Sequence, residues 1–254
     1  MYAGRLFAAA ALAALLGGAH AAPPAPRAVL VQPSAAQVPA NLLRLSIVFA
    51  APVEGEVLPR LALLYADGRP VPEPFLQQEL WSPDGKILTI LLHPGRVKTG
   101  LNAREERGPI LTAGDQVVLA LDGRPIQRWS VGPEDSDGPV ASAWKLSPVR
   151  AGSKQTLSVA LDGPIDGRDA GYLAVADSRN RRVPGHARLT EGESVWTFTP
   201  SAPWRAGQYK LLARGTLEDP AGNRLGGHFE TPADAHPGPA ADAAIAFTPG
   251  ARLH

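Results

Sequence analysis

The stretch LSIVFAAPVEGEVLPRLALLYADGRPVP, residues 45–72, recurs as LSVALDGPIDGRDAGYLAVADSRNRRVP, residues 157–184. The two segments align without a gap at a constant offset of 112, which places Leu61 on Leu173. Apolar positions and turn residues stay in phase along the whole alignment. A repeat of this length predicts two copies of one domain, because each copy specifies the same strands and turns.

Two insertions distinguish the copies beyond this stretch. TAGDQVVLALDG aligns with RAGQYKLLARG, but copy one has six extra residues around EPFLQQELW. It has thirteen more in the loop that begins at Gly95 within HPGRVKTG, because eighteen residues separate Pro94 from Ala113 whereas five separate Pro200 from Ala206. Insertions of this kind lie in loops, where binding residues concentrate.

The local pattern predicts strands. In LLRLSIVF the apolar residues Leu43, Leu45 and Ile47 alternate with polar ones, which is the period of a half-buried strand. Gly and Pro each number 26, and DG, PDG and AGN turns separate the short runs. No stretch after residue 21 has a convincing helical period. We therefore predict an all-β chain of two tandem antiparallel sandwiches with Greek-key connections.

The first 21 residues have the pattern of a secretion signal. Arg5 supplies a positive charge, Leu6–Leu16 is a short apolar run, and Ala19-x-Ala21 fits the small-residue cleavage pattern. The apolar run is too short to span a membrane, and no later stretch is long and apolar enough to do so. We expect an exported chain, in the periplasm or outside the cell, without a transmembrane anchor.

Domain boundaries follow from the repeat and the flanking composition. We assign 1–21 to the signal peptide, 22–26 to a Pro/Ala linker, 27–133 to the first domain with its inserted loop, 137–232 to the second domain, and 233–254 to a disordered tail. The acidic Gly/Pro segment GPEDSDGP forms the connection between the domains.

Composition and motifs exclude several classes of function. The net charge of +1 gives no indication of a nucleic-acid groove. The absence of cysteine removes disulfides, thiolate metal sites and a cysteine nucleophile. Neither a Gly-x-Ser-x-Gly motif nor a Walker-type loop is present. We therefore expect no cofactor and no enzymatic activity.

Three stretches resemble a known family. FAAPVEGE, ADGRPVP and WTFTPSAPWRAGQYKLLARGTLEDPAGNRL are similar to the bacterial Ig-like domains of S-layer and other exported proteins. Copy two carries the pattern's Phe198, Trp204 and Tyr209, whereas copy one has Gln116 in place of the tyrosine. FLQQELWSPDGKILTILLHPGRVKTGL also resembles exported bacterial proteins with the same tandem. The resemblance implies two Ig-like sandwiches with a scaffold, adhesion or spacer role, and no catalytic residues.

The segment EDPAGN concentrates oxygen ligands in copy two. Calcium requires about six to eight converging oxygens, and only Glu218, Asp219 and Asn223 offer side-chain oxygens here. We interpret the segment as a tight turn, with Asp219 accepting backbone N–H bonds and Gly222 and Asn223 at positive φ. A calcium site completed by GPEDSDGP at the domain junction is the alternative.

Aromatic residues in copy two have two interpretations. Trp196, Trp204 and Tyr209 could form a sugar-binding platform. The shared strand parity of Trp196 and Phe198 favours a core position instead, with the Tyr209 hydroxyl bonded to the backbone of a strand corner. Trp81 precedes the PDG turn, and we expect it to be partly exposed.

Histidine spacing gives no metal motif. If the signal were cleaved after Ala19, however, His20 would become the N-terminus and offer its amine and imidazole to copper, with His228 as a further ligand. A periplasmic protein that binds copper or calcium is therefore the alternative function.

The thirteen-residue insertion carries four basic residues against two glutamates. It lacks consecutive glycines, so it does not predict a phosphate loop. Either it folds back, with Leu101, Ile110 and Leu111 covering the sheet edge, or it contacts a partner. We predict an exported, non-enzymatic scaffold or interaction module for a protein or cell-envelope polymer. The candidate binding residues are Glu79, Trp81, Arg96, Lys98, Arg104 and Arg107.

Overall fold

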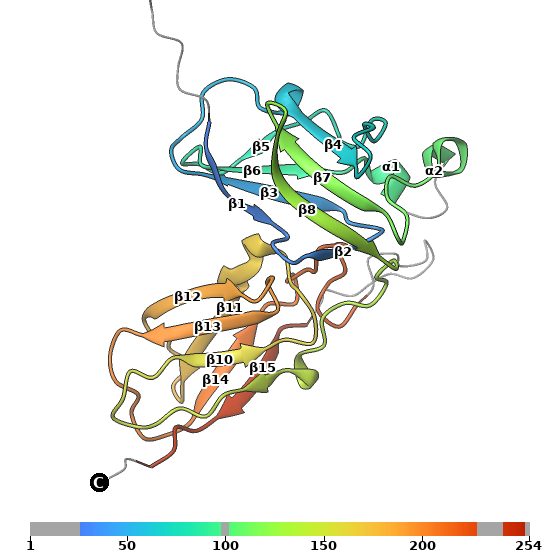
Figure 1. The fold of residues 1–254 in the computed structure, drawn as a ribbon. Coiled ribbons are helices and arrows are strands. Elements are labelled where there is room, and N and C mark those ends of the chain that lie inside the picture. The colour runs from blue at the N-terminus through green and yellow to red at the C-terminus, as the bar shows by residue number, and fades with distance from the viewer. Residues whose placement is uncertain (1–25, 98–101, 228–240, 252–254) are drawn as a thin grey trace, which may run out of the picture.

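The alternating runs of the sequence fold as short strands in two sandwiches, which lie one beyond the other along the molecule (Figure 1). The computed structural model describes residues 26–97, 102–227 and 241–251. The predicted signal peptide, Lys98 and half of the predicted tail lie outside these residues. No helix in the described ranges is long and apolar enough to cross a bilayer.

Domain 1 has eight strands in two four-stranded sheets. One sheet has the order β1-β3-β6-β5 and the other β2-β8-β7-β4, with β2 running parallel to β8 and all other pairs antiparallel. This order is the ABED sheet and the GFC sheet of an immunoglobulin fold, with strand A divided between them. The strands are β1 (Ala28–Gln32), β2 (Gln37–Pro39), β3 (Arg44–Phe49), β4 (Leu61–Tyr65), β5 (Leu80–Trp81), β6 (Ile87–Leu91), β7 (Gln116–Leu121) and β8 (Arg124–Gly132).

Domain 2 has seven strands, in the orders β12-β13-β10-β9 and β11-β14-β15. All pairs are antiparallel, and the order is that of the ABED and CFG sheets of a seven-stranded immunoglobulin sandwich. The strands are β9 (Lys145–Leu146), β10 (Leu157–Ala160), β11 (Leu173–Asp177), β12 (Gly185–Thr190), β13 (Val195–Pro200), β14 (Tyr209–Ala213) and β15 (Ala243–Phe247).

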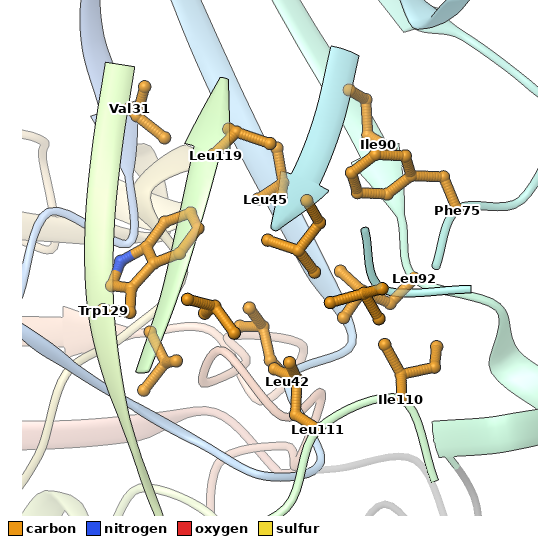
Figure 2. Close-up of a cluster of buried hydrophobic side chains, with 14 of the residues drawn as sticks. Val31, Leu42, Leu45, Phe75, Ile90, Leu92, Ile110, Leu111, Leu119 and Trp129 are labelled. Carbon is orange, nitrogen blue, oxygen red and sulfur yellow. The ribbon is translucent and has the colours of Figure 1, made fainter. Parts of the chain in front are cut away.

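The predicted fold class is confirmed, and the repeat appears directly in the strand bounds. β4 and β11 begin and end at positions that differ by 112, the offset of the sequence alignment. Each domain has its own cluster of buried apolar side chains, which lies between its two sheets. Figure 2 shows part of the domain 1 cluster, where Trp129, Leu119 and Leu45 come from both sheets.

The prediction of a disordered tail over 233–254 was wrong for residues 243–247. These residues form β15, which pairs with β14 along its whole length and completes the second sheet. Ile245 and Phe247 pack against the domain 2 core. The segment AAIAF has few large apolar residues, so its strand character depends on pairing with a distant partner rather than on its own pattern.

Helical segments are short and lie in the connections. α1 (Pro94–Val97) begins at the start of the loop 95–112, which is thirteen residues longer than its counterpart, and α2 (Asn102–Arg107) lies within this loop. Both are too short to have produced a helical period in the sequence. The described residues also form three short 3-10 helices, namely η1 (Leu58–Arg60), η2 (Ala141–Ala143) and η3 (Gly167–Tyr172).

Phe247 tests the contribution of β15. Its ring lies 5.9 Å from Trp204 and 5.7 Å from Tyr209, measured between centroids. Phe247→Ala should therefore lower the free energy of unfolding by about 2–4 kcal/mol, measured by urea unfolding followed by tryptophan fluorescence. The control Val29→Ala removes an exposed side chain from β1 and should cost less than about 0.5 kcal/mol. Equal midpoints for the two variants would contradict a structural role for β15.

Candidate functional site

Arg96, one of the predicted binding residues, is buried within its own domain. Its side chain is 5% exposed, and its guanidinium donates to the carbonyls of Pro72, Glu73, Gly108 and Pro109 at 2.6–3.3 Å. The bonds to Pro72 and Glu73 tie the inserted loop to the segment that follows β4, and the bonds to Gly108 and Pro109 join the two ends of the loop. Arg96 therefore has a structural role inside domain 1.

Glu79 and Trp81 also form local contacts. The Glu79 carboxylate accepts the N–H groups of Val57 and Leu58 at 2.6 and 2.5 Å, and the Trp81 indole N–H at 2.8 Å. Trp81 is partly exposed, as predicted, and its ring packs beside Phe49 with 5.8 Å between centroids. These contacts fix the start of η1 and the short strand β5.

Arg104 and Arg107 lie on α2. Arg104 donates to the Val97 carbonyl at 2.6 Å and pairs with Glu134, while Arg107 pairs with Glu73 on the surface at 2.7 Å. Lys98 lies outside the described residues. The five candidate residues that the structure describes do not converge on one cavity, and the part of all six in binding a partner stays a prediction.

The insertion folds back on its own domain, one of the two arrangements expected for it. Val97, Ile110 and Leu111 are buried in the domain 1 core beside Phe75. Figure 2 shows Ile110, Leu92 and Phe75 gathered at one end of the sandwich. The insertion thus closes the open side of domain 1.

The aromatic residues of domain 2 form its core, as their strand parity predicted. Trp196 and Trp204 are almost fully buried, and the Tyr209 ring meets Trp204 edge-on at 5.2 Å. The Tyr209 hydroxyl accepts the Arg205 N–H at 3.0 Å, which is the predicted corner bond at the start of β14. The described rings do not form a sugar-binding platform.

The EDPAGN segment is a tight turn, as predicted. The Asp219 carboxylate accepts the Asn223 N–H at 2.9 Å and the Asn223 side-chain N–H at 2.8 Å. Gly222 has a φ of +88°, whereas Asn223 is not at positive φ. Burial raises the pKa of Asp219 to about 7, although the bonds from Asn223 act in the opposite direction.

No group of three or more potential metal-ligating side chains gathers within the described residues. The calcium alternative would have combined EDPAGN with GPEDSDGP. In the structure the Asp135 carbonyl instead accepts side-chain N–H groups from Asn41 at 2.7 Å and from Asn223 at 3.0 Å. His20 and His228, the residues of the copper alternative, lie outside the described ranges.

A buried ionic contact joins the two domains. Arg44, at the start of β3, donates to Asp166 and to Glu218 of domain 2, the latter at 2.5 Å. Burial alone would raise the pKa of Asp166, but Arg44 and Arg168 hold it below its ordinary value. Burial raises the pKa of nearby Asp169 to about 6, against the bond that its carboxylate accepts from the Glu218 N–H.

A second contact lies beside the first. Glu193, in the β12–β13 loop, is 3% exposed and accepts the Ser34 N–H and hydroxyl of domain 1, both at 2.7 Å. Gly192 lies so close that an added Cβ would be 2.8 Å from the Ala35 Cβ. Leu43 donates its N–H to the Pro220 carbonyl at 3.0 Å. Main-chain, ionic and side-chain bonds therefore all cross the junction.

Domain 2 has an open cleft that the sequence analysis did not find. One part, about 470 Å³, lies beside β11, β12 and the crossover between them, and the adjoining part, about 370 Å³, lies between the crossover and the SAPWR turn. Arg182, Val183, Pro184 and Ser201 line both parts.

Comparison of the two copies explains the cleft. Phe75 pairs with Leu92 in domain 1, and Ala187 pairs with Phe198 in domain 2. Leu92 and Phe198 occupy equivalent positions, so Ala187 stands where domain 1 has a buried phenylalanine. Domain 2 also lacks the inserted loop. The signal was present in the sequence, since Phe75 and Ala187 align at the offset of 112.

No protein-family model and no curated protein matches the chain. Among solved structures, an L,D-transpeptidase from Mycobacterium smegmatis is 14% identical with a TM-score of 0.28, over 65% of this chain and 61% of that one. An I-band fragment of titin is 11% identical with a TM-score of 0.25, over 82% and 59%. SGBP-B from Bacteroides uniformis is 15% identical with a TM-score of 0.27, over 89% and 50%.

The chain therefore spans about three fifths of the length of the first two structures and half of the third. The likeness is distant in each case. The class of the protein, two tandem Ig-like sandwiches, follows from the strand order of its four sheets.

Because Arg44 lies in a buried ionic contact between the domains, its replacement should strongly reduce stability. Arg44→Met leaves Asp166 and Glu218 without their shared cation, and should lower the free energy of unfolding by about 3 kcal/mol. Arg60→Met is the matched control, because the Arg60–Asp122 pair is exposed to solvent and its loss should change stability much less. Urea unfolding measures both, and a loss for Arg44→Met as small as that of the control would rule out the ionic contact as a determinant of stability.

The raised pKa of Asp219 predicts that the stability of the protein decreases as the pH rises toward neutrality. The folded pKa of Asp219 is raised, so the folded state holds a proton that the unfolded chain has released, and stability should decrease as the pH rises from about 4 to about 7. Asp169 contributes in the same direction up to about pH 6, whereas the stability due to Asp166 is lost only below about pH 4.

Asp219→Asn keeps the side-chain oxygen that accepts the Asn223 N–H and removes the titration. Melting temperatures measured between pH 5 and pH 7.5 should therefore fall less steeply for this variant than for the wild type. Identical slopes would show that Asp219 does not titrate in this range.

Proposed function

We propose that the chain is an exported, non-enzymatic module of two Ig-like domains that binds a protein or a polymer of the cell envelope. The observation that carries this proposal is the open cleft of domain 2. The fold is the same in both copies, but only domain 1 fills its open side with its own residues, Phe75 and the inserted loop.

The junction supports a binding role for the pair of domains. Arg44 and Glu193 each lie in a buried contact between the domains, so the cleft is presented on a unit of defined shape. Pre-organisation of this kind reduces the entropy lost on binding. A scaffold or spacer would need the junction but would not need the cleft.

Export and the absence of catalysis remain parts of the proposal. The N-terminal pattern of Arg5, an apolar run and Ala19-x-Ala21 supports secretion. The resemblance of WTFTPSAPWRAGQYKLLARG to Ig-like domains of S-layer proteins supports a place in the cell envelope. Loops at the edges of such sandwiches commonly carry binding residues.

Capture from separated envelope fractions tests the function. The immobilised protein is exposed in turn to purified envelope polysaccharide, to peptidoglycan and to extracted envelope proteins, with binding followed by surface plasmon resonance. We expect saturable binding to one fraction, without any change in the chemical composition of what is bound. The proposal fails if no fraction binds saturably, or if mass spectrometry finds the bound material chemically converted.

Ala187→Phe should reduce this binding by about tenfold or more, because the new ring fills the cleft as Phe75 does in domain 1. His186→Phe, which adds a ring to the opposite face of the same strand, is the control and should bind as the wild type does.

A further inference from the structure

β12 is an edge strand with free backbone groups. Within the part of the chain that the structure describes, it pairs only with β13. Ser201 donates its N–H to the Pro184 carbonyl, which sets the alternation of hydrogen-bonded positions along the antiparallel pair. Gly185, Ala187 and Leu189 consequently direct their N–H and C=O groups away from β13. An edge of this kind can receive another extended chain.

The inner face of the same strand borders the larger part of the cleft. Gly185 and Ala187 line it together with Val175, Trp196 and Phe198. Gly185 passes so close to Phe198 that an added Cβ would lie 2.4 Å from the ring. Apart from Arg182 and Ser201, the side chains that line this part are apolar, and Phe198 is held against Gly185. A strand added at β12 would direct every second side chain into the cleft.

At the far end of β12, η3 packs beside the strand, and the Trp196 indole N–H donates to the Ala170 carbonyl at 3.1 Å. The cleft is thus closed at the Leu189 end and open at the Gly185 end, where it continues toward the SAPWR turn.

The open end is positively charged. Arg181, Arg182 and Arg205 line it, and Asp177 is the one acidic residue that lines it in the described ranges. Asp177 is paired with Arg181 at 2.8 Å. Arg182 and Arg205 form no salt bridge with any described residue and are exposed. Arg188 adds a further exposed cation on the outer face of β12.

The equivalent opening in domain 1 is filled by the chain itself, which indicates the kind of ligand that the cleft of domain 2 can accept. There the chain itself supplies the filling: Phe75 lies in the position of Ala187, and the inserted loop adds Ile110 and Leu111. Arg96 of this loop donates to the carbonyl of Pro72. The counterpart of Pro72 in domain 2 is Pro184, and Pro184 lines both parts of the cleft. In domain 1 the place is filled by apolar side chains on a segment of polypeptide.

We propose that the cleft of domain 2 binds an extended acidic peptide segment of a partner protein, which adds to the edge of β12. Alternate apolar side chains enter the slot beside Ala187, and carboxylates meet Arg182, Arg205 and Arg188. This inference rests on the proposed binding function and names its partner class and its site. A peptide is favoured over an anionic polysaccharide because a free strand edge and an apolar slot both match a polypeptide.

Titration of the protein with synthetic peptides tests the inference. The probe is a fluorescein-labelled heptapeptide that alternates Asp or Glu with Phe, Leu and Val, and binding is followed by fluorescence anisotropy. We expect saturable binding that weakens as salt is added, since charge pairs at an exposed rim are screened. Two comparison peptides carry Lys in place of the acids, or Ser in place of the apolar residues, and both should bind about tenfold more weakly or worse.

Two variants locate the site. Ala187→Phe should abolish binding by filling the slot, and the double variant Arg182→Glu with Arg205→Glu should weaken it by about tenfold or more through charge reversal. Arg128→Glu with Arg124→Glu, which reverses the same amount of charge on exposed residues of domain 1, is the control and should bind as the wild type does. The double variant keeps the test valid if Ala187→Phe fails to fold, and thermal melting reports folding for each.

Three outcomes would overturn the inference: no binding of the acidic peptide, equal binding of the Lys peptide, or binding unchanged in both cleft variants. Loss of envelope-fraction binding in Ala187→Phe without any peptide binding would keep the proposed function and reject the partner class. Binding of purified anionic polysaccharide that the acidic peptide cannot displace would also reject it. Absence of binding to any probe or fraction would reject the function as well.

Discussion

A two-sheet sandwich is open where its chain crosses from one sheet to the other, and the residues at that crossing decide whether the opening is filled. In domain 1, Phe75 and the inserted loop fill it, and Arg96 fastens the loop with four bonds to main-chain carbonyls. In domain 2, Ala187 and a five-residue turn leave it open. The two copies thus share a fold and differ in whether this opening between the sheets is filled.

The second constraint is the junction, where a buried arginine requires its acidic partners. Arg44 comes from domain 1, and Glu218 comes from the long connection between β14 and β15 of domain 2. The corresponding connection in domain 1 is a tight turn between β7 and β8. The longer connection therefore has a structural consequence, because it supplies Glu218 and the Pro220 carbonyl to the neighbouring domain. The pair of domains is held by contacts that neither copy could make alone.

Sequence reasoning reached the fold because strands leave a period-two pattern and the repeat doubles the signal. It also placed Tyr209 at its corner and Asp219 in its turn, since both depend on local geometry. It missed β15, whose small residues become a strand only by pairing with β14. It placed Arg96 among the binding residues, because the sequence does not show whether an arginine is exposed or buried with its guanidinium bonded to main-chain carbonyls. It missed the cleft because the cleft results from two features that domain 2 lacks, namely a counterpart of Phe75 and the inserted loop.

Amide hydrogen exchange along β12 shows whether a peptide adds to this strand edge. Ala187 and Leu189 direct their N–H groups to the free edge, whereas His186 and Arg188 are already bonded to β13. Addition of the acidic heptapeptide should slow exchange at Ala187, while exchange at His186 and Arg188 should change little. Unchanged exchange at Ala187 under saturating peptide, or protection confined to residues outside the cleft, would contradict the addition of a peptide at this edge.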